Sequence, residues 1–267
     1  MCKVISAANH KGGVAKTTSV VNIGIGLARI GQKVLLVDSD PQGSLTSSLG
    51  FGEPDSIEYT LATGLGRLLD GKEYNPEDGI LHHEEGVDLI PGNIDLSVVG
   101  VNLLQAMRSE FVMKEYLEPL KEKYDWIFID CMPSLEKLTV NALAAADSVI
   151  IPVQAGYLPT KGLEQIIGTI RRIKQRKVNS GLKVEGILMT MVDVRTNYSK
   201  DIIQKINEDY GKLVPIFDSQ IPLSVRVAEC SKLGVSIYKH DPKGKAATAY
   251  GSLALEVLKR KAEGGEC

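Results

Sequence analysis

Residues 10–18 stand between an apolar run and an amphipathic run, and they read His10-Lys11-Gly12-Gly13-Val14-Ala15-Lys16-Thr17-Thr18. The paired glycines let backbone N–H groups close around an anion, because neither residue carries a Cβ. The helix predicted to follow points its positive end at the same place. We therefore predict that residues 11–18 form a nucleotide-binding phosphate loop. In such a loop Lys16 contacts the β- and γ-phosphates, and the Thr17 hydroxyl binds Mg²⁺.

The loop departs from the common pattern G-x-x-x-x-G-K-[ST], because its two glycine positions hold His10 and Ala15. It meets a deviant form, K-G-G-x-x-K-T-[ST], in which Lys11 is an additional lysine ahead of the glycines. A methyl group on Ala15 lies next to the phosphates and could weaken nucleotide binding or move the Lys16 backbone. Two alternatives to a working loop are a degenerate site and a glycine-rich turn with an incidental lysine.

Strand-like and helix-like runs alternate along the chain, as in α/β proteins. Strands are predicted at 3–8, 34–37, 87–91, 124–130, 148–153, 186–192 and 214–217, and helices at 17–30, 96–108, 112–123, 138–146, 159–177, 197–210 and 246–261. Residues 50–86 are predicted to form loops and short helices. The pattern predicts one domain over residues 1–267 that contains a doubly wound, mostly parallel sheet of about seven or eight strands flanked by helices.

Two acidic segments directly follow predicted strands. Asp38 and Asp40 come at the carboxyl edge of the sheet, where open α/β sheets bind their ligands. Asp40 could position or polarise the water that attacks a γ-phosphate. Without the loop upstream, an acidic pair before Pro41 would be interpreted as a turn. Asp130 ends a run of four apolar residues and is predicted to reach Mg²⁺, directly or through water.

Together these segments resemble the ParA/Soj family, within the ParA/MinD superfamily of ATPases that carry the deviant Walker A loop. The resemblance covers nearly the whole chain and is most specific at 9–50 and 124–160. It implies a P-loop NTPase fold, ATP and Mg²⁺ as cofactors, and hydrolysis of ATP to ADP and phosphate that is weak unless a partner stimulates it. It assigns water activation to Asp40 and support of the site to Asp38. Residues 131–135 resemble the family's γ-phosphate switch.

The resemblance also implies an ATP-dependent homodimer in which two nucleotides are sandwiched between the subunits. Lys11 would cross to the nucleotide of the partner subunit and act as an arginine finger does in trans. The alternative for Lys11 is an exposed loop lysine. Asp193 and Pro222 fall where relatives line the adenine pocket.

Nonspecific binding of double-stranded DNA by this dimer is implied too, together with a ParB-like DNA-binding partner. The DNA-contacting arginines of the family fall on Arg195 and Arg226. Between residues 195 and 261 the chain holds 12 Lys and Arg against 7 Asp and Glu. This local excess, and a second basic cluster at 171–177, fit phosphate contacts, although basic helix residues are often only a solvated face. The implied function is segregation of a plasmid, chromosome or mobile element.

Composition and short motifs indicate the cellular environment of the protein. The net charge is −2, with 43% hydrophobic and 24% charged residues, as in ordinary soluble globular proteins. The four cysteines show no zinc spacing, and we expect a reducing, cytoplasmic environment. Association with the nucleoid is implied by the family resemblance. No signal peptide or membrane span is predicted. Cys131 is predicted to be a packed small residue, and 82–85, His-His-Glu-Glu, a solvated polar turn rather than a metal site.

Two other ATPase-like classes remain as alternatives. A MinD-like ATPase of the membrane surface would need bulky apolar anchors in its C-terminal helix, and residues 258–267 hold few. An iron–sulfur carrier that shares the deviant loop would need a bridging cysteine pair, and Cys131 and Cys230 lack that spacing.

Overall fold

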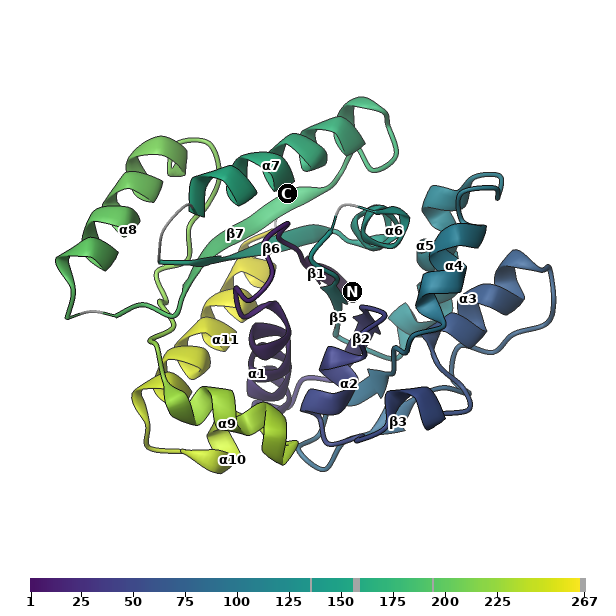
Figure 1. The fold of residues 1–267 in the computed structure, drawn as a ribbon, viewed down its shortest axis with the longest axis horizontal. Coiled ribbons are helices and arrows are strands. Elements are labelled where there is room, and N and C mark those ends of the chain that lie inside the picture. Colours follow the sequence, from purple (N-terminus) through teal and green to yellow (C-terminus); the bar gives the residue numbers. More distant parts are fainter. Residues whose placement is uncertain (135, 156–158, 194, 265–267) are drawn as a thin grey trace.

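The computed structural model describes residues 1–134, 136–155, 159–193 and 195–264, and its centre is one seven-stranded sheet (Figure 1). The order across the sheet is β3-β4-β2-β5-β1-β6-β7. β3 runs antiparallel to β4, and the other neighbouring strands are parallel. The strands are β1 (Lys3–Ala7), β2 (Val34–Ser39), β3 (Leu81–His82), β4 (Asp88–Ile90), β5 (Trp126–Cys131), β6 (Ser148–Gln154) and β7 (Lys183–Thr190). The predicted mostly parallel, doubly wound sheet is confirmed.

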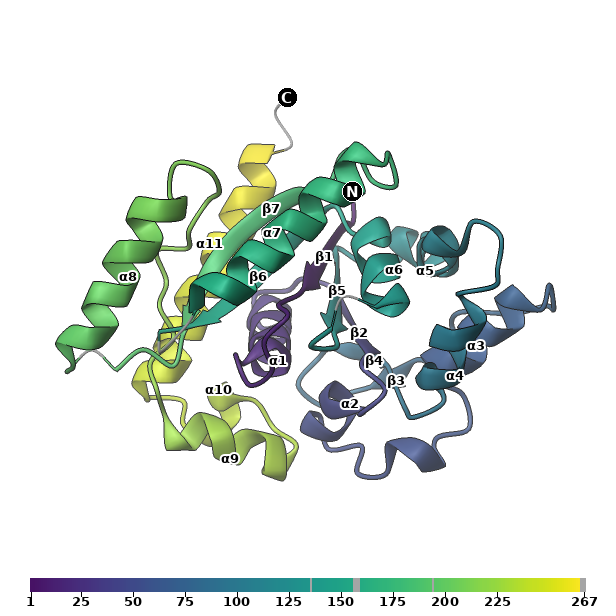
Figure 2. The ribbon, with the colours of Figure 1, turned by 45° about the horizontal axis from the view of Figure 1, so that its top comes forward.

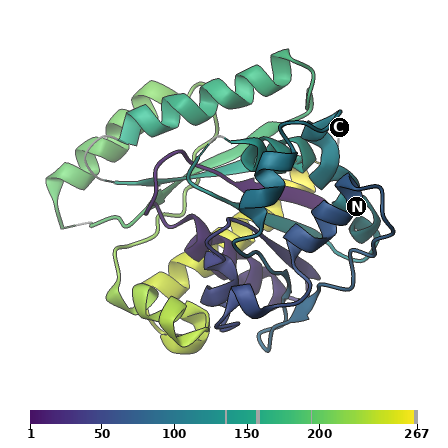
Figure 3. The same cartoon turned by 45° about the vertical axis from the view of Figure 1, so that its right-hand side comes forward.

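Helices cover both faces of the sheet, and Figures 2 and 3 show α7 and α11 on opposite sides of it. One face carries α1 (Lys16–Ala28), α2 (Ser44–Ser48), α9 (Val225–Leu233), α10 (Ile237–His240) and α11 (Lys245–Gly264). The other face carries α3 (Leu61–Leu69), α4 (Leu96–Asn102), α5 (Val112–Leu117), α6 (Lys137–Ala145), α7 (Pro159–Gln175) and α8 (Asn197–Tyr210). Three short 3₁₀ turns lie at Pro54–Ser56, Ser109–Phe111 and Glu118–Glu122.

Continuous apolar runs form the central strands because both faces of the sheet are covered. In β2, Leu35 and Val37 pack into the core on the α3–α8 face, while Val34 and Leu36 pack into the core on the α1 and α11 face. All four side chains are at most 2% exposed. This two-sided burial removes apolar area from water on both faces, at roughly 25 cal/mol per Å².

The chain leaves β1 and β5 in opposite directions. From β1 it crosses through α1 to β2, on the far side of β5, whereas from β5 it crosses through α6 to β6, on the far side of β1. The two crossover helices lie on opposite faces of the sheet (Figure 1). The carboxyl ends of β1 and β5 therefore form a topological switch point, the place where open α/β sheets bind ligands.

Several predicted boundaries differ from the structure. The prediction of a strand at 214–217 is wrong, because the segment makes one isolated bridge, from Ile216 to Ile187. The helix predicted at 112–123 divides at Glu118, where Pro119 lacks an N–H group and a 3₁₀ turn follows. The helix predicted at 96–108 ends at Asn102.

Candidate functional site

Two polar residues hydrogen-bond the loop between β1 and α1 to the strands β6 and β7. Asn9 donates from Nδ2 to the Pro152 carbonyl at 2.7 Å and accepts the Lys11 backbone N–H at 3.0 Å. Thr190, the last residue of β7, donates from Oγ1 to the Val14 carbonyl at 3.1 Å. Neither residue is among those predicted from the sequence. The sequence offers only a weak signal for them, a polar residue where an apolar strand ends, and many strands end in this way.

Lys16 and Thr17 open α1 at the switch point. Lys16 is 7% exposed. Thr17 Oγ1 donates to Asp130 Oδ2 at 2.6 Å, so the loop after β1 and the end of β5 meet as predicted. The other oxygen of Asp130 is buried and finds no hydrogen-bond partner among the described residues. Burial, followed by the nearby charge of Asp38, raises the pKa of Asp130 to about 8.

The Thr17 hydroxyl and the Asp130 carboxyl group are suitable ligands for a magnesium ion. Mg²⁺ prefers oxygen ligands and is commonly held by one or two carboxylates or hydroxyls together with nucleotide phosphates. The unsatisfied Asp130 Oδ1 and the Thr17 hydroxyl supply oxygens of that kind beside the first turn of a helix. A cation there would also stabilise the ionised form of Asp130, which burial disfavours. Thr17 and Asp130 are therefore the residues that could hold the metal.

Asp38 lies in β2 beside Asp130, Asp40 directly follows that strand, and the surroundings of the two carboxylates differ. Asp38 is the register partner of Asp130 and accepts hydrogen bonds from the Thr46 backbone N–H and hydroxyl, both at 2.8 Å. Burial raises the pKa of Asp38 to about 6. Asp40 is 9% exposed, and its Oδ1 accepts the Gln42 N–H at 3.0 Å. Asp38 thus anchors α2, while Asp40 keeps acceptor capacity for a ligand.

Ala15 adopts a backbone conformation that favours glycine. Its φ of 62° and ψ of 35° lie in the left-handed region, directly before Lys16. A left-handed residue with a Cβ costs roughly 1–2 kcal/mol. Gly13 also has a positive φ, 70°, which glycine adopts without that cost. Residue 15, where the common loop pattern has glycine, thus has a left-handed backbone. Alanine adopts this conformation under strain.

The remaining predicted binding residues lie at the surface. Lys11 is exposed. Asp193 and Pro222 are neighbours, because Val192 and Pro222 form an isolated parallel bridge. The Asp193 carboxylate accepts a hydrogen bond from Arg195 Nε at 2.9 Å, and Arg195 lowers the pKa of Asp193. The predicted adenine-pocket residue and the predicted DNA-binding residue are therefore paired with each other.

Arg226 is paired as well. Its NH1 lies 3.1 Å from Glu229 Oε2, and that same oxygen lies 2.8 Å from His240 Nε2. The side chains of Arg195 and Arg226 nevertheless remain 84% and 62% exposed, so water competes with both ion pairs. Exposed pairs of this kind are weak enough for a stronger anion to replace the carboxylate.

The segment after β5 is described except for Leu135, so the predicted switch at 131–135 lies partly outside the described residues. Cys131 is buried, and burial raises the pKa of its thiol to about 12, which confirms a packed, unreactive residue. The Ser134 hydroxyl is buried and has no partner among the described residues. Val194, inside the predicted 193–197 motif, also lies outside the described residues.

The prediction of a solvated turn at 82–85 is only partly right. His82 is exposed and pairs with Asp88, but His83 is 9% exposed and its Nε2 lies 3.4 Å from the Gly234 carbonyl. Glu85 accepts the Ser236 N–H at 2.8 Å, so the turn holds the α9–α10 connection against the sheet. No group of three metal-ligating side chains was found in the described part of the chain.

Comparison with known proteins agrees with this geometry. A family model described as an AAA domain matches residues 2–184. The sporulation initiation inhibitor protein Soj of Bacillus subtilis is 40% identical over 259 residues, which cover 96% of this chain and 98% of Soj. The chromosome partitioning protein ParA of Myxococcus xanthus is 40% identical over 260 residues, 97% of this chain and 88% of that protein. The chain belongs to the ParA/Soj family. It is therefore a P-loop ATPase of the ParA/MinD type, with ATP and Mg²⁺ as cofactors.

Solved structures of other proteins share the fold. A Mycobacterium smegmatis protein named cobyrinic acid a,c-diamide synthase, with bound ADP and magnesium, has a TM-score of 0.86 at 36% identity, covering 99% of this chain and 97% of that one. Pyrococcus horikoshii MinD, complexed with Mg-ADP, has a TM-score of 0.73 at 26% identity, covering 96% of each chain. Among the described helices of this ParA/Soj-family chain, none has the length and apolarity to cross a bilayer.

Proposed function

We propose that this chain is an ATP-dependent DNA partition protein that acts as one domain over residues 1–267. It binds Mg-ATP, forms a nucleotide sandwich dimer that binds double-stranded DNA nonspecifically, and hydrolyses ATP to ADP and phosphate. The observation that carries the proposal is the Thr17–Asp130 contact at the switch point, with the second Asp130 oxygen buried and unsatisfied. Family membership links this site to partition and positioning ATPases.

In the proposed reaction the residues mainly position and neutralise, as phosphoryl transfer requires. Backbone N–H groups of residues 12–16 and the amino end of α1 bind the phosphates, and the buried Lys16 ammonium neutralises their charge. Thr17 and Asp130 would hold a magnesium ion, which would offset the charge that develops on the transferred group. Asp40 holds the attacking water, and Asp38 fixes the segment that carries Asp40 through its bonds to Thr46.

Dimer formation is the step proposed for Lys11. The exposure of Lys11 on the loop leaves its side chain able to reach a second subunit. A cation brought to the partner's nucleotide would make ATP part of the interface and place positive charge where the transition state needs it. A closed twofold dimer uses the same surface on both subunits, so each subunit would supply one such lysine.

DNA binding is proposed on the side of the molecule that carries α8 and α9, through Arg195 and Arg226. Both side chains are largely exposed and held by weak ion pairs that phosphates would replace. Phosphate contacts carry no base specificity and weaken as salt rises. A ParB-like DNA-binding protein would stimulate hydrolysis, and the protein would act at the nucleoid in the cytoplasm.

The direct test is binding to unrelated duplex DNA with ATP, with ADP and without nucleotide, at low and moderate salt. We expect ATP-specific, salt-sensitive binding that Arg195→Ala/Arg226→Ala weakens strongly. A matched pair on α3 and the turn after α4, Arg67→Ala/Arg108→Ala, removes the same charge and should leave binding nearly unchanged. Equal loss in the two pairs would remove Arg195 and Arg226 from the DNA surface, and absence of binding in every state would contradict the partition proposal.

The alternative function is that of a MinD-like ATPase at a membrane surface. The exposed positions in the described end of α11 are Ser252, Leu255, Lys259, Ala262 and Glu263. Leu255 is the one bulky apolar side chain among these five, which is little for an interfacial anchor. Sedimentation with liposomes in the presence of ATP would favour this alternative if the protein pelleted with the lipid.

A further inference from the structure

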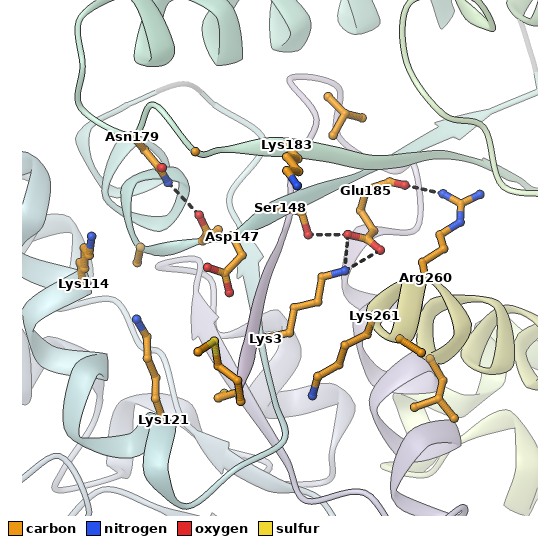
Figure 4. Close-up of a pocket in the computed structure, with 18 of the residues that line it drawn as sticks. Lys3, Lys114, Lys121, Asp147, Ser148, Asn179, Lys183, Glu185, Arg260 and Lys261 are labelled. Carbon is orange, nitrogen blue, oxygen red and sulfur yellow. Dashed lines mark hydrogen bonds and ion pairs between the residues drawn. The ribbon is translucent and has the colours of Figure 1, made fainter. Parts of the chain in front are cut away.

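A cavity of about 1030 Å³ lies at the amino-terminal edge of the sheet, at the opposite end of the strands from the phosphate loop (Figure 4). The starts of β1, β6 and β7 contribute Lys3, Ser148 and Lys183 to its lining. Four further cations come from α5, from the 3₁₀ turn after it and from the last turns of α11. The proposed nucleotide-binding site uses none of these residues.

The lining of this cavity, which we call the basic cavity, holds six cations and two carboxylates. The cations are Lys3, Lys114, Lys121, Lys183, Arg260 and Lys261, and the carboxylates are Asp147 and Glu185. In Figure 4 Lys114 and Lys121 enter from one side and Lys3 and Lys261 from the other. In a chain whose net charge is −2, this is a local concentration of positive charge. Low-dielectric walls focus the field of such a cluster and raise the local concentration of anions.

The two carboxylates are already engaged. Glu185 accepts a hydrogen bond from the Ser148 hydroxyl at 2.6 Å and lies 2.8 Å from Lys3 Nζ. Asp147 accepts the Val4 N–H at 2.8 Å. Both acidic side chains therefore serve the ends of β1 and β6. Two further cations pair with carboxylates outside the lining, Lys121 with Glu118 and Arg260 with Glu256, each at 2.8 Å, so three of the six cations have a carboxylate partner.

Three of the lysines lack a carboxylate partner within the described residues. Lys114 and Lys183 make no side-chain hydrogen bond or ion pair there, and Lys261 Nζ donates to the Asp125 carbonyl at 2.7 Å while lying over the Trp126 ring. Partial burial lowers the pKa of Lys261. A bound anion would pair with these three ammonium groups, for which the described residues supply no carboxylate within ion-pair distance.

We propose that the basic cavity binds a small polyanion that carries two or more phosphate groups. Lysine ammonium groups are compact point charges with three rotatable donors, which suits phosphates that arrive in varied geometry. The cavity is concave and partly lined by small apolar residues such as Ala144 and Ala145, a shape that admits a small molecule. A DNA duplex is convex and would contact the rim instead. This site is independent of the proposed ATPase cycle.

Isothermal titration with inorganic tripolyphosphate, without Mg²⁺, tests the proposal. The phosphate loop is a second site for this probe, so we expect the native chain to bind it at two sites. Lys16→Ala should remove one site, and Lys114→Gln/Lys183→Gln should weaken the other on the order of tenfold or more, since each tenfold step is only about 1.4 kcal/mol. Lys200→Gln/Lys212→Gln on or next to α8 removes the same charge from exposed lysines and should preserve both sites.

Three results would overturn the proposal. The first is a single site that Lys16→Ala abolishes completely. The second is equal weakening by the cavity pair and the α8 pair, which would mean that only overall charge matters. The third is loss of duplex DNA binding in Lys114→Gln/Lys183→Gln with tripolyphosphate binding unchanged, which would assign these lysines to a DNA surface. All four lysines are exposed, so these variants should fold, and a thermal melt of each verifies it.

Discussion

Thr17 Oγ1 lies 2.6 Å from Asp130 Oδ2, so the first turn of α1 is bonded directly to the end of β5. The two residues are 113 positions apart in the chain. Asp130 is fully buried in the sheet edge, and its second oxygen has no partner among the described residues. The folded chain therefore holds a half-satisfied carboxyl group beside a hydroxyl, an arrangement that a bound cation would complete.

Asp130 should make the metal-free protein less stable as pH rises. Burial raises its pKa from 3.8 to about 8, so folding favours the protonated form, and the associated stability is lost as pH rises through about 8. Asp130→Asn removes the ionisation and keeps an acceptor for Thr17. We expect the variant to gain on the order of a few kcal/mol relative to the native chain between pH 6 and pH 9. Urea denaturation without Mg²⁺ measures this difference.

The control for that experiment is Asp125→Asn, a change of the same chemistry at a carboxylate that is only partly buried. Comparison of the two variants separates the effect of burying Asp130 from the loss of one carboxylate. Parallel pH profiles for the native chain and Asp130→Asn would show that Asp130 is ionised at little cost, contrary to its burial.

Ala15→Gly should stabilise the protein. The φ of 62° costs alanine roughly 1–2 kcal/mol, and glycine gives back part of this gain through its more flexible unfolded state. We expect a net increase of about 0.5–1 kcal/mol in the free energy of unfolding, and ATP binding at least as tight as in the native chain. Chemical denaturation without nucleotide, followed by an ATP titration, provides both numbers.

Ala28→Gly supplies the matched comparison, because Ala28 is the last residue of α1 and has helical geometry. The same chemical change there should destabilise the protein by roughly 0.5–1 kcal/mol. A shift of the same sign in both variants would mean that the left-handed geometry of Ala15 carries no strain.

Asp40→Ala should separate ATP binding from turnover. Asp40 contacts the Gln42 N–H and has no role in holding Lys16 or Thr17 in the described structure, so the nucleotide should still bind. Loss of the group that holds the attacking water should lower the hydrolysis rate by about 10²-fold or more. The ATP-bound, DNA-bound dimer should then accumulate. Phosphate release and nucleotide binding are measured side by side.

Asp40→Asn distinguishes the charge of Asp40 from its place in the turn, because asparagine keeps the acceptor for Gln42. It should be as slow as Asp40→Ala if the carboxylate orients the water. Hydrolysis at the native rate in either variant would remove Asp40 from the reaction.

Substitution of the two lysines of the loop should remove different properties of the protein. Lys16→Ala removes a buried cation next to the phosphates and should abolish ATP binding. Lys11→Ala alters an exposed side chain and should leave ATP binding to the monomer intact while preventing the ATP-dependent dimer. Binding of a fluorescent ATP analogue and light scattering with ATP report the two properties. Tight ATP binding by Lys16→Ala, or a normal dimer of Lys11→Ala, would contradict these assignments.

Local patterns in the chain were sufficient to predict six of the seven strands, the phosphate loop and the carboxylates at 38, 40 and 130, whereas β3 falls in the stretch predicted to form loops and short helices. Strands covered on both faces must be continuously apolar, and the loop needs glycine where backbone N–H groups approach an anion, so both leave traces in consecutive residues. The helix predicted at 197–210 has these bounds in the structure, where Thr196 is its N-cap and accepts the Ser199 N–H.

Contacts between distant segments leave no pattern in consecutive residues and were not predicted. Three features depend on how strands and loops meet after folding. They are the support of the loop by Asn9 and Thr190, the left-handed geometry of Ala15, and the pairing of Arg195 with Asp193. The basic cavity is the extreme case, since its lysines come from both ends of the chain and its middle. Each is an ordinary surface residue in its own segment, and convergence in space is what turns the set into a site.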